Sequence, residues 1–424
     1  MSKYWYRLDN AAMIFPPISD KLSPNTFCMS ASLKEKVDKE ILQKSLIQVL
    51  KSEDTFKVRL KKGVFWYYLE ENNKTPLVLD EPADLMEYIN YRYDDNFLFR
   101  VYVRENRISV VFFHALTDGT GGLYFLKQLL YRYFINIGHD INNEGLIKPI
   151  DIPTTNEDAA DKFLMVDTSS KTKKISEVKA HKLSGTPFKV FGTGIICGEC
   201  EISKVKSLAK KYNTTITGYL CGVYMYSLYK AYIENKNCKN KKLAISIPVN
   251  IRKQHPSKTK RNFSLVVRIS YDFSKTATFE DVMQDCIKQF KEKITTEQID
   301  AQIKFNTGAE KNIFMRIVPR FIKNIVLRFA YWIRGNKQES TNLSNIGNVE
   351  LPTEMSKHIE KMHFILQASK TTQKNLSVLG FNDKLYITFS RKHIESAAEK
   401  FFFKTLTEQG VQVVLNSNYQ EAKT

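Results

Sequence analysis

The sequence predicts an α/β protein made of two domains of similar architecture. Short strands alternate with amphipathic helices in both halves of the 424 residues, and no repeat of fixed period is present. A polar segment with three prolines interrupts this pattern over residues 140–188. We therefore expect two α/β sandwiches, over residues 1–150 and 189–424, joined by a crossover linker over residues 151–188.

Composition indicates a folded chain with a strong basic excess. Hydrophobic residues make up 43% and charged residues 26%, and the net charge is +19. Such a charge favours anionic partners such as nucleic acid, anionic lipid or a phosphate-bearing cofactor. Alternatively, the basic excess reflects composition alone, because the chain is rich in lysine, asparagine and isoleucine, as an AT-rich genome would produce. Because no zinc finger or RNA-binding signature is present, we expect no nucleic-acid partner.

Cysteine usage and hydropathy favour a cytoplasmic protein without metal. Six cysteines are scattered along the chain, and its first residues lack a continuous apolar stretch. The single CxxC, Cys197 to Cys200, has no second pair at zinc-site spacing. No run of 18 uncharged apolar residues occurs, so no membrane span is expected.

In the N-terminal half, residues 26–33 read as a strand and residues 38–50 as a helix capped by Asp38. The segments FKVRL and VFWYYLE predict a hairpin. The apolar run within residues 107–113 is typical of a strand buried on both faces. That strand ends directly before His114.

The C-terminal half repeats strand and helix. Residues 192–202 read as a strand, and Ser203 as the cap of a helix that reaches Tyr212. A second helix begins at Thr215 or Thr217 and runs to about residue 233. Further elements are expected as strands over residues 242–249 and 264–273 and a helix over 279–293.

The most informative segment is HALTDG, in which His114, Asp118 and Gly119 form an HxxxDG pattern before a helix. A histidine at a strand end can act as a general base, because its pKa lies near neutrality. An aspartate beside a glycine could fix the loop by pairing with an arginine. The alternative is a turn histidine whose hydrogen bonds are all satisfied. The GTGG that follows lacks the Lys-Ser/Thr of a phosphate loop, so tight helix packing explains it better.

HALTDG, with a strand before it and a helix after it, resembles the signature of the acyltransferase superfamily of chloramphenicol acetyltransferases, condensation domains, wax ester synthases and alcohol acetyltransferases. YRLDNAAMIFP and GVFWYYLEEN resemble bacterial alcohol acetyltransferase-like proteins, while ISIPVNIR and SNIGNVELP resemble two later segments of the superfamily. Condensation domains carry two adjacent histidines. Here Phe113 occupies the first position, which counts against that branch.

The resemblance implies two chloramphenicol acetyltransferase-like sandwiches with the active site in a tunnel between them. It implies that His114 deprotonates an acceptor, which attacks an acyl thioester directly, with Asp118 organising the loop. Gly119 and Arg252 would support the site, Arg252 by pairing with Asp118. Neither a metal nor a permanently bound cofactor is implied, and acyl-CoA is the expected co-substrate.

Two further groups of residues could contact substrate. A hydroxyl and an amide at Ser344 and Asn345 could meet an oxyanion, although the asparagine of such a turn can equally cap its own backbone. A cationic loop could hold the phosphates of coenzyme A, or be a solvated loop of a lysine-rich protein. Its candidate residues are Lys253, Lys258, Lys260 and Arg261.

The mostly apolar segment 312–334 predicts a helix with a kink at Pro319. It could contact an anionic membrane peripherally or cover the pocket of an apolar acceptor. Alternatively, the segment is a buried helix with one solvent-exposed edge. The basic residues that form a narrow stripe on it are Arg316, Arg320, Lys323 and Arg334.

These observations favour an acyl-CoA-dependent acyltransferase that moves an acetyl or other acyl group to an alcohol. Two alternatives stay open. The first is an amide-forming condensation enzyme that uses a carrier-bound donor. The second is a catalytically silent binding module of the same fold. The sequence gives no indication of oligomeric state.

Overall fold

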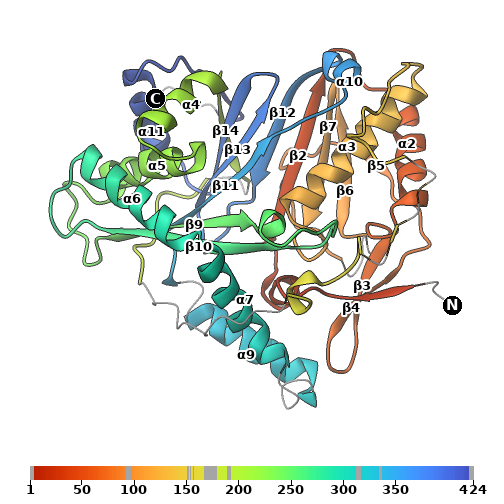
Figure 1. The fold of residues 1–424 in the computed structure, drawn as a ribbon, viewed down its shortest axis with the longest axis horizontal. Coiled ribbons are helices and arrows are strands. Elements are labelled where there is room, and N and C mark those ends of the chain that lie inside the picture. The colour runs from red at the N-terminus through yellow and green to blue at the C-terminus, as the bar shows by residue number, and fades with distance from the viewer. Residues whose placement is uncertain are drawn as a thin grey trace.

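The computed structural model describes residues 4–91, 97–149, 152, 154–155, 157–166, 179–188, 192–311, 317–333 and 337–419. Two mixed α/β halves lie side by side, each built on its own large sheet (Figure 1). The α/β class predicted from the sequence is therefore confirmed. Arg316 and Arg334 lie outside the described residues.

The first half is a five-stranded sheet in the order β12-β2-β7-β6-β5. Strand β7 lies at its centre, and residues 108–113 are all buried, as the continuous apolar run predicted. The strands are β2 (Thr26–Leu33), β5 (Val78–Asp80), β6 (Phe99–Arg104), β7 (Arg107–Phe113) and β12 (Ile359–Leu366). Helices α2 (Lys39–Ser52) and α3 (Gly119–Asn136) pack together beside this sheet (Figure 1).

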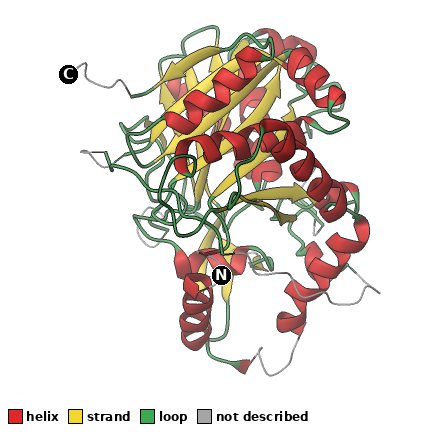
Figure 2. Ribbon diagram, turned by 90° about the vertical axis from the view of Figure 1, so that its left-hand side faces the viewer, coloured by secondary structure: helices red, strands yellow, loops and turns green. Residues whose placement is uncertain are grey.

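The second half is a seven-stranded sheet in the order β10-β9-β11-β13-β14-β8-β15. Its strands are β8 (Gly194–Glu201), β9 (Lys242–Asn250), β10 (Ser264–Asp272), β11 (Thr341–Asn348), β13 (Lys374–Phe381), β14 (Lys384–Arg391) and β15 (Val414–Ser417). Its helices are α4 (Ile202–Lys211), α5 (Ile216–Tyr232), α6 (Phe279–Lys293) and α11 (Ala397–Glu408). Figure 2, which faces this half, shows helices lying over the strands.

Shorter elements surround the two sheets. A three-stranded sheet has the order β1-β4-β3. The remaining elements are β1 (Trp5–Arg7), β3 (Val58–Lys62), β4 (Tyr67–Glu71), η1 (Ala12–Ile14), α1 (Phe15–Ile18), η2 (Lys162–Leu164), η3 (Ile251–Lys253), α7 (Thr296–Lys311), α9 (Arg320–Ile333) and α10 (Thr353–Lys357). Within the described ranges, no helix is long and apolar enough to cross a membrane.

Strand β12 links the two halves. It follows β11 in the chain, yet it pairs antiparallel with β2 of the other sheet, with Phe364 opposite Met29. The five-stranded sheet is therefore completed by residues from the C-terminal part of the sequence. The domain boundaries expected from the sequence stay a prediction.

Most of the predicted elements are observed. Strand β2 and helix α6 have the predicted bounds, and Asp38 caps α2 by accepting from two backbone N–H groups. The cap at Ser203 is wrong, because α4 already begins at Ile202 without a side-chain cap. Ile317 is helical, Pro319 is not, and α9 begins directly after it, so the helix is interrupted at the proline, while residues 312–316 lie outside the described ranges.

The start of α3 is a point of very close packing. A Cβ atom on Gly121 would overlap the backbone carbonyl oxygen of Lys260 and the hydroxyl of Thr117, and one on Gly119 would overlap Ile346. Lys260 and Ile346 belong to the C-terminal part of the chain, so these glycines let α3 approach it. Tight helix packing, rather than a phosphate cradle, therefore accounts for GTGG.

We expect Gly121→Ala to destabilise the fold by about 1–3 kcal/mol, the usual cost of overpacking a close contact. The matched control is Gly308→Ala, because Gly308 is also helical and a Cβ there would meet no atom of the described residues within 4 Å. That control should be neutral or stabilising by up to about 1 kcal/mol. Urea unfolding measures both changes. Equal midpoints for the two variants would contradict the packing account.

Candidate active site

His114 lies at the end of the central strand β7. Its backbone N–H donates to the carbonyl oxygen of Asn25 at 2.9 Å, which continues the pairing beyond the strand. Its ring stacks on Phe15 with centroids 4.6 Å apart and meets Phe27 edge-on at 5.3 Å. The imidazole is therefore held between two aromatic rings while staying partly exposed.

Asn262 fixes the orientation of this ring. Its Nδ2 donates to the backbone carbonyl oxygen of His114 at 3.1 Å, so its Oδ1 faces His114 Nδ1 at 3.0 Å. An amide oxygen can only accept, and Nδ1 of the neutral ring must therefore carry the proton. The other nitrogen, Nε2, then holds the lone pair, as a general base requires.

Asp9 in turn orients Asn262. The carboxylate is buried and accepts from Asn262 Nδ2 at 3.1 Å and from the Asn262 backbone N–H at 3.3 Å. Burial raises the pKa of Asp9 to about 6, although the hydrogen bonds from Asn262 and Ala12 oppose this shift. Sequence reasoning assigned no role to either residue. Asp9 lies in YRLDNAAMIFP, one of the segments that carry the family resemblance, and that position could have indicated its role. No local pattern marks Asn262.

Burial also sets the protonation state of His114. Loss of solvent lowers the pKa of its imidazole below the ordinary 6.5, because the charged ring is poorly solvated there. Smaller opposing effects come from its own backbone, from Asp118 and from Asn262. The ring is therefore neutral at neutral pH.

The predicted pair of Asp118 and Arg252 is present, with the carboxylate buried and the guanidinium partly buried. Arg252 Nη1 lies 2.8 Å from Asp118 Oδ2, and Nη2 lies 3.3 Å from Oδ1. Asp118 also accepts from the backbone N–H groups of Phe263 at 2.9 Å and Gly121 at 3.1 Å. The second of these bonds caps α3. The carboxylate thus joins the loop after β7 to the segment between β9 and β10.

Two of the four candidate phosphate contacts point away from solvent. Arg261 is 1% exposed, donates to the backbone carbonyl oxygen of Leu116 at 3.1 Å and lies over the ring of Tyr6. Lys260 lies 4.0 Å from the ring centroid of Tyr124 and 3.6 Å from Asp158. The expectation for Arg261 is corrected, since its guanidinium braces the loop after His114. Lys260 is engaged in an ion pair.

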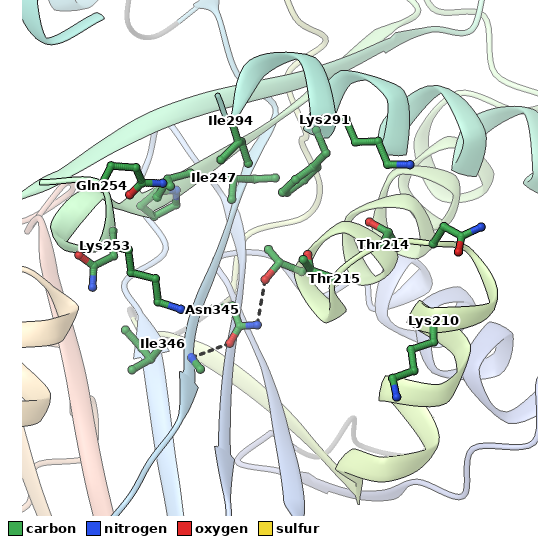
Figure 3. A pocket seen from close by; sticks show the side chains of 17 residues that line it. Lys210, Thr214, Thr215, Ile247, Lys253, Gln254, Lys291, Ile294, Asn345 and Ile346 are labelled. Atoms are coloured by element: carbon green, nitrogen blue, oxygen red, sulfur yellow. Dashed lines mark hydrogen bonds between the residues drawn. The ribbon is translucent and has the colours of Figure 1, made fainter. Parts of the chain in front are cut away.

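An open cavity of about 880 Å³ lies beside this loop in the C-terminal half (Figure 3). Its wall touches the start of α3, because Asn250 Nδ2 donates to Thr120 Oγ1 at 3.1 Å. Of the candidate phosphate contacts only Lys253 lines it, while Lys258 is exposed elsewhere on the same loop. Two lysines that sequence reasoning missed, Lys210 and Lys291, also line the cavity. They come from α4 and α6, and no local pattern links them.

Ser344 and Asn345, which were expected in a turn, lie instead in strand β11, and they differ in their surroundings. Asn345 lines the cavity, and its Nδ2 donates to Thr217 Oγ1 at 3.0 Å (Figure 3). Its Oδ1 accepts from the Gly347 backbone N–H at 2.8 Å, a local cap at the irregular end of β11. Ser344 is buried in β11 and does not line the cavity.

Within the described ranges, no group of His, Cys, Asp and Glu side chains could hold a metal ion. Cys197 packs in the core of the first half, and Cys200 packs in the core of the second half. This follows from their odd spacing along β8, which places them on opposite faces of the sheet. Burial raises the pKa of the Cys197 thiol to about 11, so it stays protonated.

Solved structures resemble the chain over nearly its whole length. Polyketide synthase associated protein 5 from Mycobacterium tuberculosis is 12% identical with a TM-score of 0.60, covering 95% of this chain and 97% of its own. TRI3 trichothecene 15-O-acetyltransferase from Fusarium sporotrichioides is 10% identical with a TM-score of 0.61, covering 96% and 94%. The starter condensation domain of rhizomide synthetase is 13% identical with a TM-score of 0.57, covering 96% and 93%. These likenesses establish the fold.

Sequence comparison establishes the family. No curated protein matches the chain. The family model described as alcohol acetyltransferase matches residues 161–384, which is more than half of the 424 residues. The matched range contains Arg252, Asn262 and the lining of the cavity, while His114 precedes it. The chain is therefore an acyltransferase that belongs to the alcohol acetyltransferase family.

Proposed function

We propose that this protein transfers an acetyl group from acetyl-CoA to an alcohol with His114 as the general base. The observation that carries the proposal is the ring of His114, whose Nδ1 faces Asn262 Oδ1 and whose Nε2 is left with the lone pair. Nε2 takes the proton of the alcohol while the oxygen attacks the thioester carbonyl carbon. When the C–S bond breaks, the proton passes from Nε2 to the sulfur of coenzyme A.

The open cavity is our proposed donor site. Apolar side chains such as Ile247, Val249 and Phe290 suit the pantetheine chain, and the ammonium groups of Lys210, Lys253 and Lys291 suit phosphates. The cavity borders the start of α3, so a thioester there would lie near the loop of His114. The tunnel implied by the resemblance stays a prediction.

Asn345 is the proposed donor to the oxyanion. Its Nδ2 carries two hydrogens and gives one to Thr217, which leaves one for the cavity that it lines. Ser344, the other expected donor, is buried away from that cavity. The proposal therefore rests on the amide alone.

We expect acetyl-CoA to release its thiol when an alcohol is supplied, and His114→Ala to reduce this rate about a hundredfold or more, the usual contribution of a general base. A thiol reagent follows the release with a panel of alcohols. His139→Ala is the matched control, because His139 lies just beyond the far end of α3. Equal rates in wild type and His114→Ala would refute the role. Failure of all acyl-CoAs would favour a carrier-bound donor.

The pH profile tests the buried base. Since the pKa of His114 is lowered below 6.5, kcat/KM should fall at acidic pH with a midpoint below pH 6.5, where the ring becomes protonated. Asn262→Ala removes an acceptor that favours the charged ring, so its acidic limb should lie at the same or lower pH.

The same variant should also lose about tenfold or more in kcat, because the ring is no longer held in one tautomer. Asn416→Ala, at an exposed position on β15, is the control. An acidic limb above pH 6.5 in wild type would contradict this account, as would an unchanged kcat in Asn262→Ala.

A further inference from the structure

Helix α9 presents a row of large apolar side chains to solvent. Phe321, Ile325, Phe329 and Trp332 are 62%, 64%, 61% and 61% exposed. Their spacing places them on one side of the helix over about 16 Å at the usual rise per residue. Figure 1 shows α9 at the lower edge of the molecule, away from the two large sheets. A surface helix normally buries such a face.

Two cationic side chains of α9, Arg320 and Lys323, point toward the protein, while Arg328 is exposed and reaches back to it with one nitrogen. Arg320 Nε donates to the Gly63 carbonyl oxygen at 2.9 Å, and Lys323 Nζ lies 3.3 Å from the ring centroid of Trp66. Arg328 Nε donates to the Pro17 carbonyl oxygen at 2.6 Å. These contacts fix the rotation of the helix, so the apolar row is held outward by the fold.

The tip of the β3–β4 hairpin extends this surface. Val64 and Phe65 are 73% and 43% exposed, and the Val64 carbonyl oxygen accepts from the Arg320 backbone N–H at 2.8 Å. We call the four exposed α9 residues together with Val64 and Phe65 the α9 face. Six exposed apolar side chains on two adjoining elements differ from the single, scattered apolar residues that are normal on soluble proteins.

The charge around the α9 face identifies its partner. Residues 317–332 contain no acidic residue, Arg328 is exposed, and the whole chain carries +19. Lys62, next to the hairpin turn, is exposed, and Lys337 Nζ lies 5.4 Å from the ring centroid of Trp332. A second copy on a two-fold axis would set this basic surface against itself. An anionic lipid surface would complement it.

We propose that the α9 face inserts into the surface of an anionic lipid bilayer. The apolar row enters the boundary between headgroups and acyl chains, Trp332 lies at the headgroup level, and the flanking lysines meet lipid phosphates. Helix α9 contacts α1 through Pro17, and Phe15 of α1 stacks on His114. If the proposed function holds, an alcohol dissolved in the bilayer would therefore reach a site close to the membrane.

Vesicle co-sedimentation tests the binding with the full chain. We expect wild type to sediment with vesicles of phosphatidylglycerol and phosphatidylcholine in equal parts, and less with phosphatidylcholine alone or at high salt. Phe329→Glu should weaken the partitioning about tenfold or more, because a charge replaces a buried ring. Leu415→Glu is the matched control, since Leu415 is an exposed apolar residue on β15. Circular dichroism verifies that both variants fold.

Binding that survives Phe329→Glu, or that falls equally with Leu415→Glu, would overturn the proposal. A second result would also overturn it: wild type does not bind vesicles, and sedimentation shows a dimer that Phe329→Glu converts to a monomer. The α9 face would then join two copies of the chain. Quenching of Trp332 by brominated acyl chains, lost in Trp332→Phe, provides an independent supporting readout. None of these measurements depends on catalysis, so their result is separate from that of the acyl-transfer assay.

Discussion

The ion pair between Asp118 and Arg252 is the contact on which the rest of the site depends. It joins residues 134 positions apart and brings the loop after β7 to the segment between β9 and β10. The carboxylate is buried, and it is stabilised by the two terminal nitrogens of the guanidinium and by two backbone N–H groups. Lysine could not replace this two-point contact, because its ammonium is a single charge without the planar fork.

Each of the two halves contributes part of the site. The five-stranded sheet brings His114 to the end of its central strand, while Asn262, which faces Nδ1, comes from the other half. Asp9 and Arg261 then occupy the space behind the loop as a buried layer. A ring held in one tautomer and kept neutral by burial is matched to proton abstraction near neutral pH.

Local sequence patterns predicted many of the secondary-structure elements, but they did not predict which distant residues come together in the fold. The hairpin, the buried run of β7 and the cap at Asp38 follow from periodicity and local hydrogen bonding, and the structure shows all three; of the two expected starts of α5, Thr215 is the observed cap. The pairing of Asp118 with Arg252 was predicted because the resemblance supplied the partner. Arg261 escaped prediction because a cation in a basic loop has the same local pattern whether it faces solvent or the core.

The same limit applies to α9 and β12. Alternation of apolar and basic residues predicts an amphipathic helix but cannot say which face meets the protein, and in α9 the basic face does. Likewise, the sequence of β12 is that of any strand, and only the completed structure places it beside β2. Each of these features depends on residues far apart in the chain.

The central claim is that acyl transfer is direct, with His114 as the base and no acyl-enzyme. Initial rates over a matrix of acetyl-CoA and alcohol concentrations test it most directly. Direct transfer requires both substrates to be bound together, so double-reciprocal plots should give intersecting lines. Parallel lines, the signature of a covalent intermediate formed before the alcohol binds, would contradict the account.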